Sequence, residues 1–273
     1  GASEYLKISC PLRYGRLGEI RSRTHIFGFN SNGEIKTIQG RSGGWLTASE
    51  WLKRTAGNDW QYFSAGGYSG AFHYMGEYYF PCLPYQSNTI FGKDAFERQE
   101  VEEAFTAWHD LQMRLPNLMN ADLPGPVRRF LIRVLQLDAA ALAQRGHCLH
   151  NIIGGRVTVL PPDTRHVEYD VLPVVISDGC LYRCRFCRVK SGLGFKVRPQ
   201  KEISEQIKNL KKFYGKDLKN YNAIFLGQHD ALNAGTDTLL YAAEEAYRVF
   251  EISHSVMKDP RLFCFGSVDS LLS

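Results

Sequence analysis

The second half of the chain alternates short apolar runs with helical patterns. Residues 171–177 (VLPVVIS), 222–227 (NAIFLG) and 261–266 (RLFCFG) are mostly apolar, which is typical of buried parallel strands. Between these runs, hydrophobic residues recur at helical spacing, first up to Gly215 and then from Thr236 to Phe250. Strands that alternate with helices in this way predict right-handed crossovers and a parallel sheet.

The first half mixes strand and helix patterns. Residues 24–30 and 34–39 flank an Asn-Gly pair, which predicts a β-hairpin. A capping-box pattern at residues 47–50 predicts a short helix from Ala48 to about Gly57. Further strands are expected at 60–64 and 71–80, and further helices at 105–115 and 127–135. The aromatic residues of this half are interpreted as core rather than as a substrate pocket.

These patterns predict an α/β protein in two parts. Residues 1–155 form an α+β domain whose role the sequence does not indicate, and residues 156–273 form a parallel α/β domain. The chain has 273 residues, with 44% hydrophobic and 22% charged residues, as in ordinary globular proteins. No run approaches the roughly 18 apolar residues that span a bilayer, and no secretory signal begins the chain.

Charge and cysteine content narrow the function classes. The net charge of +5 is only mildly basic, so it neither indicates nor excludes nucleic-acid binding. The seven cysteines are odd in number and unevenly spaced, which does not fit a disulfide framework. We therefore expect a cytoplasmic protein without a membrane partner, in which some thiolates bind metal.

Three of the cysteines lie close together directly after the first parallel strand. Cys180, Cys184 and Cys187 have the spacing C-x3-C-x2-C, and thiolates are the preferred ligands of iron–sulfur clusters and zinc. A closed zinc site would need a fourth ligand, but neither His166 nor His229 has a usual spacing to the cysteines. Three cysteines at the carboxyl end of a parallel strand fit a cluster with one iron open to a small molecule.

The form C-x3-C-x-aromatic-C after the first strand resembles the radical S-adenosylmethionine (SAM) enzyme superfamily. The resemblance implies a 4Fe–4S cluster held by Cys180, Cys184 and Cys187, with SAM chelating the open iron through its amino and carboxylate groups. It further implies reductive cleavage of SAM to a 5′-deoxyadenosyl radical, which abstracts hydrogen from a substrate that this sequence does not identify. Phe186 would lie near the adenine, and flavodoxin or ferredoxin would donate the electron.

The second parallel strand matches this family only in part. Family members often end this strand with Gly-Gly-Glu or a variant, which binds the amino group of SAM, whereas this chain has Gly227, Gln228, His229 and Asp230. The three side chains after the glycine, or the backbone carbonyls, could accept hydrogen bonds from the ammonium group of SAM. His229 is also the alternative metal ligand, and it could equally be a polar loop residue without a role.

The family fold is a partial, TIM-like (β/α) barrel with more βα units than the three expected here. Residues 156–273 are therefore expected to be the first part of a longer core that is truncated here and is poorly soluble or inactive alone. No catalytic residue beyond the cluster is assigned.

Other polar residues of this half have weaker interpretations. Lys190, Lys196 and Arg198 could contact the SAM carboxylate or an anionic substrate, although a solvated basic loop is the simpler interpretation. The scattered cysteines could include ligands of a second cluster but are better interpreted as ordinary buried residues, with Cys264 the clearest case; they are Cys10, Cys82, Cys148 and Cys264.

Two other functions remain open. One is a zinc- or cluster-stabilised nucleic-acid-binding module that uses the basic balance and the aromatic residues. The other is an inactive radical-SAM-like scaffold, which the altered Gly-Gly-Glu segment favours.

Overall fold

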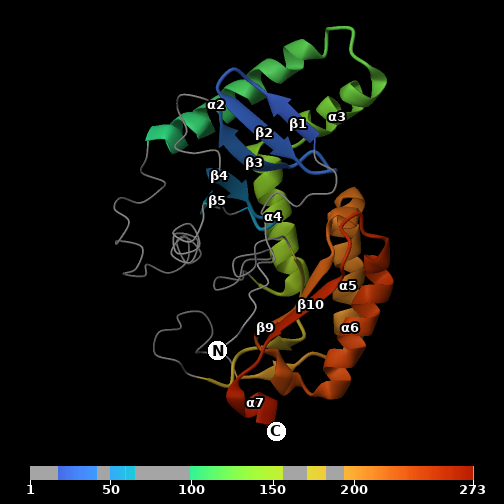
Figure 1. Cartoon of the computed structure of the whole chain (residues 1–273). Helices are drawn as coiled ribbons and strands as arrows, with labels where there is room; N and C mark the ends of the chain where they lie inside the picture. Colours follow the sequence, from blue (N-terminus) through green and yellow to red (C-terminus); the bar gives the residue numbers. More distant parts are fainter. Residues whose placement is uncertain are drawn as a thin grey trace. The chain divides into compact units, whose positions relative to one another are not determined.

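The structure is a computed structural model that describes residues 18–41, 50–58, 60–64, 99–155, 171–182 and 194–272. The described residues fall into two compact units, which divide between Gly146 and His147 (Figure 1). Within the described ranges, no helix is both long enough and apolar enough to cross a membrane.

The first unit contains a five-stranded antiparallel sheet with the strand order β1-β2-β3-β4-β5. Its strands are β1 (Gly18–Arg21), β2 (His25–Phe29), β3 (Ile35–Gly40), β4 (Glu50–Arg54) and β5 (Trp60–Ser64). The predicted hairpin is confirmed as β2 and β3. Gly33 occupies a left-handed conformation in its turn, and the side chain of Asn30 accepts the backbone N–H groups of Asn32 and Glu34.

The predicted helix from Ala48 to Gly57 is wrong, because residues 50–54 form strand β4. This strand lies between β3 and β5, with Leu52 fully buried opposite Ile38. Pairing on both edges and burial of Leu52 outweigh the local capping pattern, as tertiary contacts commonly do for short segments.

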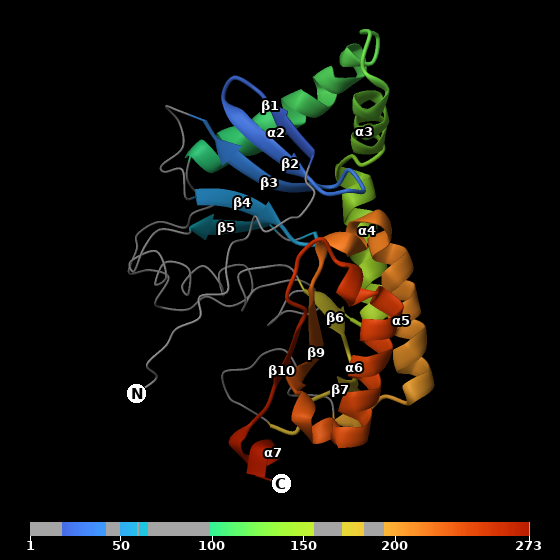
Figure 2. The ribbon, with the colours of Figure 1, turned by 45° about the vertical axis from the view of Figure 1, so that its right-hand side comes forward.

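Helix α2 lies across the antiparallel sheet (Figure 2). The helices that follow the sheet in the chain are α2 (Gln99–Leu118), α3 (Gly125–Leu135) and α4 (Ala139–Ile153), of which the first two were predicted; the division between the two units falls within α4. Trp108 of α2 packs against Phe27 and Phe29 of β2, with ring centroids 5.8 and 5.6 Å apart. These aromatic residues are buried in the hydrophobic core of the unit.

The second unit contains a three-stranded parallel sheet with the order β10-β9-β6. Its strands are β6 (Leu172–Val174), β9 (Ala223–Asp230) and β10 (Arg261–Phe265). Helices α5 (Gln200–Tyr214) and α6 (Thr236–Phe250) lie side by side on one face of the sheet (Figures 1 and 2). The predicted mixed α/β class and the parallel sheet are thus confirmed, whereas the three described parallel strands do not close into a barrel.

The first parallel strand is shorter than predicted, because other elements satisfy the backbone that follows it. The buried amide of Gln206 on α5 donates to the carbonyl of Val175 and accepts its N–H, both at 2.8 Å. The carbonyl of Ile176 accepts the N–H of Arg198 at 2.9 Å. The chain then pairs again in a two-stranded antiparallel ladder of β7 (Ser177–Asp178) and β8 (Lys196–Val197).

Short helical turns complete the second unit. They are η3 (Gly215–Asn220), η4 (Ala231–Ala234), η5 (Ile252–His254) and α7 (Val268–Leu272). Of these, η4 follows β9 and α7 follows β10, so both lie at the carboxyl ends of parallel strands.

Candidate functional site

The cysteine loop follows β7 and does not leave directly from the first parallel strand, since β6 already ends at Val174. Gly179 adopts a left-handed conformation with φ of 69°, which turns the chain sharply out of β7. Cys180 follows as a half-buried free thiol, and its Sγ accepts the backbone N–H of Tyr182 at 3.4 Å. Cys184, Phe186 and Cys187 lie outside the described residues.

An ion pair closes the base of this loop. The guanidinium of Arg198 contacts both carboxylate oxygens of Asp178, at 2.9 Å from Nε and 2.5 Å from Nη2. Its Nη2 also donates to the carbonyl of Ile153 at 2.9 Å. Arg198 is therefore a structural partner of Asp178 and not a solvated basic residue, whereas Lys196 is exposed as expected. Together with the β7–β8 ladder, this pair holds the two ends of the loop together.

The segment predicted to bind the amino group of SAM interrupts the sheet. Cys264 of β10 pairs with Leu226 of β9, but the next residue, Phe265, pairs with Asp230. Residues 227–229 therefore have no register partner on the described strands beside them. Backbone carbonyls at such an irregularity can accept a hydrogen bond from a ligand, which is the chemistry that an ammonium group requires.

Gly227 makes the irregularity sterically possible. Its φ of 77° lies in the left-handed region, and a Cβ at this position would lie 2.9 Å from the Cβ of Ala231. Only glycine fits this backbone without strain. Gln228 and His229 belong to the same strand, but their side chains are outside the described part of the site.

Asp230 is the centre of a hydrogen-bond network at the carboxyl ends of the strands. Its Oδ2 accepts the hydroxyl of Tyr182 at 3.0 Å and the amide Nδ2 of Asn233 at 2.5 Å. Its Oδ1 accepts the hydroxyl of Ser270 at 2.6 Å. The Tyr182 hydroxyl also lies 2.6 Å from Oγ of Ser267. The network thus joins the cysteine loop to the ends of β9 and β10.

The charge of Asp230 is stabilised by these contacts. Burial works to raise its pKa, but hydrogen bonds from Ser267, Ser270 and Tyr182 outweigh burial and hold the pKa below its usual value. The carboxylate is therefore ionised at neutral pH, and both of its oxygens already accept protein donors. Sequence reasoning named Asp230 but gave no signal for its partners, because isolated Tyr and Ser residues form no recognisable pattern.

The other described cysteines lie outside this site. Cys264 is exposed on β10 and Cys148 is exposed on α4, so the prediction that they are buried is wrong for both. Cys264 is accessible because β10 is the edge strand of the described sheet. Cys10 and Cys82 are outside the described residues. Among the residues that the structure describes, no group of three or more His, Cys, Asp or Glu side chains is placed to hold a metal ion.

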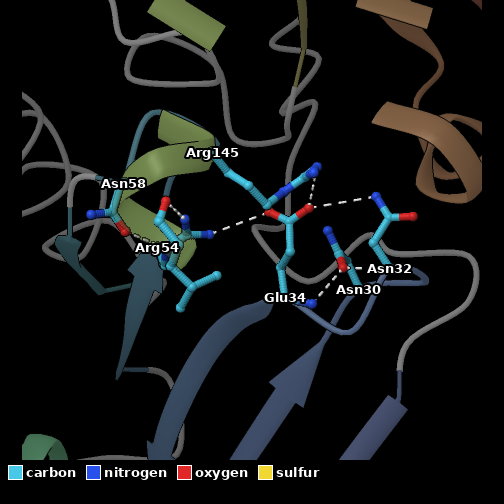
Figure 3. A network of polar contacts seen from close by, with 7 residues as sticks. Asn30, Asn32, Glu34, Arg54, Asn58 and Arg145 are labelled. Atoms are coloured by element: carbon cyan, nitrogen blue, oxygen red, sulfur yellow. Dashed lines mark hydrogen bonds and ion pairs between the residues drawn. The ribbon is translucent and has the colours of Figure 1, made fainter. Parts of the chain in front are cut away.

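The antiparallel unit contains a second buried polar cluster (Figure 3). Glu34 lies between two arginines, with Oε1 2.7 Å from Arg145 and Oε2 3.4 Å from Arg54. Arg54 is fully buried and also donates to Asn58 at 2.7 Å and to the carbonyl of Leu142 at 3.1 Å. These contacts join the turn before β3, strand β4 and helix α4, so the cluster serves the packing of this unit.

Comparison of the chain with protein-family models, curated proteins and solved structures gave no match.

Proposed function

We propose that this chain is a radical SAM enzyme. Cys180, Cys184 and Cys187 would hold a 4Fe–4S cluster, and the irregular end of β9 would receive SAM. The observation that carries the proposal is the hydrogen bond between Tyr182 and Asp230, because it brings the cysteine loop beside the segment expected to bind the ammonium group. The consecutive order of β6, β9 and β10, with both helices on one face, supports the beginning of a partial (β/α) barrel.

The described part of the site fits such a cluster. The thiol of Cys180 is half-buried and receives a backbone N–H, and hydrogen bonds to sulfur help to set the potentials of iron–sulfur clusters. When bound, the cluster would pass an electron from a donor such as flavodoxin or ferredoxin to SAM, which would cleave to methionine and a 5′-deoxyadenosyl radical that abstracts hydrogen from the substrate.

The protein's own residues would position SAM. Residues 227–229 have no register partner on the neighbouring described strands, which supports their carbonyls as acceptors for its ammonium group. The side chains of Gln228 and His229 are the further candidates from the same segment. Phe186 would contact the adenine from within the cysteine loop.

Anaerobic reconstitution with iron and sulfide tests this proposal. We expect about four irons per chain. We also expect an electron paramagnetic resonance signal of the reduced protein that changes when SAM is added. Cys184→Ala should lose both the iron and the signal. Cys148→Ser is the matched control, because it removes an exposed cysteine outside the loop and should change neither.

Two results would contradict the proposal, each in favour of one alternative. Purified protein that contains zinc but takes up no iron would favour a zinc-stabilised binding module, which a nucleic-acid binding assay would then examine. A cluster whose signal is indifferent to SAM would favour an inactive scaffold.

A further inference from the structure

The network around Asp230 joins hydroxyl groups and an amide at one carboxylate. Tyr182 donates to Oδ2 of Asp230, Ser270 donates to Oδ1, and Asn233 adds an amide donor to Oδ2. The hydroxyls of Tyr182 and Ser267 lie 2.6 Å apart, and either can donate to the other. The Tyr182 hydroxyl is therefore held by Asp230 and Ser267 together.

Asp230 is enclosed as well as hydrogen-bonded. Its exposed fraction is 7%, and its partners come from three places, namely the cysteine loop, the turn η4 after β9, and the segment that begins α7 after β10. A carboxylate whose oxygens already accept hydrogen bonds from Tyr182, Asn233 and Ser270 is poorly suited to bind an additional ammonium group. It is well suited to hold its neighbours in place.

Tyr182 connects this anchor to the cysteine ligands. It is two residues after Cys180 and two before Cys184, and its own N–H donates to Cys180 Sγ at 3.4 Å. Its side chain is fixed by Asp230 and Ser267 at 3.0 and 2.6 Å. The hydrogen bonds of the Tyr182 hydroxyl therefore hold the same residue whose N–H contacts the Cys180 sulfur.

We propose that Asp230 is a positioning residue that fixes the cysteine loop through the hydroxyl of Tyr182, and is not a ligand of SAM. This inference rests on the proposed function, because the loop needs a fixed geometry in order to hold a cluster. It also removes Asp230 from the candidates for the ammonium acceptor, which leaves the carbonyls of residues 227–229 and the side chains of Gln228 and His229.

The first test uses the protein without cluster and follows the alkylation of Cys180 by iodoacetamide, resolved by peptide mass spectrometry. Asp230→Asn and Tyr182→Phe should each raise the rate about fivefold, which corresponds to about 1 kcal/mol for one lost hydrogen bond. Cys180 should be alkylated no faster in the double variant than in the single variants, because both substitutions break the same hydrogen bond between Tyr182 and Asp230. The alkylation of exposed Cys148 is the internal control.

The second test uses reconstituted protein. Tyr182→Phe and Asp230→Asn should both take up iron but give a broadened signal and a shifted reduction potential, whereas SAM should still change the signal. Tyr247→Phe removes a hydroxyl from α6 outside the network and should leave the signal unchanged. Tyr182→Phe is the milder variant, and it decides the outcome if Asp230→Asn does not fold.

The proposal would be overturned if Tyr182→Phe left both the alkylation rate and the cluster signal unchanged while Asp230→Asn abolished the response to SAM. Asp230 would then be a SAM ligand. Failure of the proposed function gives a different result. If the wild-type chain took up no iron, Tyr182→Phe and Asp230→Asn would still raise the alkylation rate of Cys180, because that test uses the protein without cluster.

Discussion

At the scale of single residues, Glu34 carries a buried negative charge that two arginines compensate. Glu34→Gln would leave Arg54, which is fully buried, without this carboxylate. Removing one partner of a buried ion pair typically costs about 3 kcal/mol or more, so we expect a loss of about 3 kcal/mol in the free energy of unfolding. Urea denaturation measures it.

The control for this substitution is Glu19→Gln. Glu19 pairs with Arg21 on an exposed part of β1, and exposed pairs contribute little, so the change should stay within about 0.5 kcal/mol. Equal losses in the two variants would show that the buried pair contributes no more than a surface pair.

The buried carboxylate of Glu34 also makes the stability of the fold depend on pH. Burial works to raise the pKa of Glu34, but the charges of Arg145, Arg54 and Lys36 outweigh it and hold the pKa below its usual value. Below about pH 4.3, the unfolded chain therefore binds a proton at Glu34 before the folded chain does, and stability falls as the pH falls through the folded pKa.

The pH dependence is measured by urea denaturation of both chains between neutral and acidic pH. A protonated Glu34 resembles glutamine, so the stability difference between wild type and Glu34→Gln should be complete at neutral pH and shrink in acid. A difference that stays constant down to the acid limit would contradict the assignment.

Residue types alone predict only part of the site. Cys180 and Asp230 could be named from the sequence because each follows an apolar run at a recognisable position. Tyr182 and Ser267 could not, because their roles depend on two strand ends meeting in space. Cys264 was misassigned for the same reason, since an apolar run does not reveal which strand lies at the edge of the sheet.

At the scale of elements, the end of β9 depends on the left-handed conformation of Gly227. Gly227→Ala should be more destabilising than Gly194→Ala. The positive φ of Gly227 costs an alanine about 1–2 kcal/mol, and Gly227 also lacks space for a Cβ, whereas Gly194 has no positive φ and has nothing within 4 Å of an added Cβ. Adding Ala231→Gly should restore the steric part of the loss, because the added Cβ would otherwise lie 2.9 Å from that of Ala231.

Urea midpoints of the three variants measure these effects. Equal losses at the two glycines, or no recovery on adding Ala231→Gly, would show that the close approach at Gly227 is relieved by small shifts of the backbone.

Long periodic elements were predictable and short ones were not. The helix Thr236–Phe250 was predicted with its observed bounds, because its apolar face and its flanking residues agree. The capping pattern before β4 was misleading, since pairing with two neighbouring strands decides the conformation there. The first parallel strand was predicted too long, because Gln206, a helix residue, takes over the backbone hydrogen bonds of Val175.

At the scale of the whole molecule, the division between Gly146 and His147 predicts separate responses to substitution. Glu34→Gln should raise amide hydrogen exchange in β2 and β3 and leave β6 and α5 unchanged. Gln206→Met should do the reverse, because it leaves the buried N–H and carbonyl of Val175 without this partner, at a cost of about 2 kcal/mol. Glu205→Met, at an exposed neighbouring position, is the matched control.

Binding of the proposed cluster extends the same prediction. A ligand that binds only the folded state stabilises the unit that holds it, so reconstitution should slow exchange in the unit with Cys180 and leave the antiparallel unit unchanged. Hydrogen-exchange mass spectrometry resolves both units in one experiment. If every variant and the cluster altered exchange equally in both units, the chain would unfold as a single cooperative body, and the antiparallel unit would have to be counted as part of the structure that supports the site.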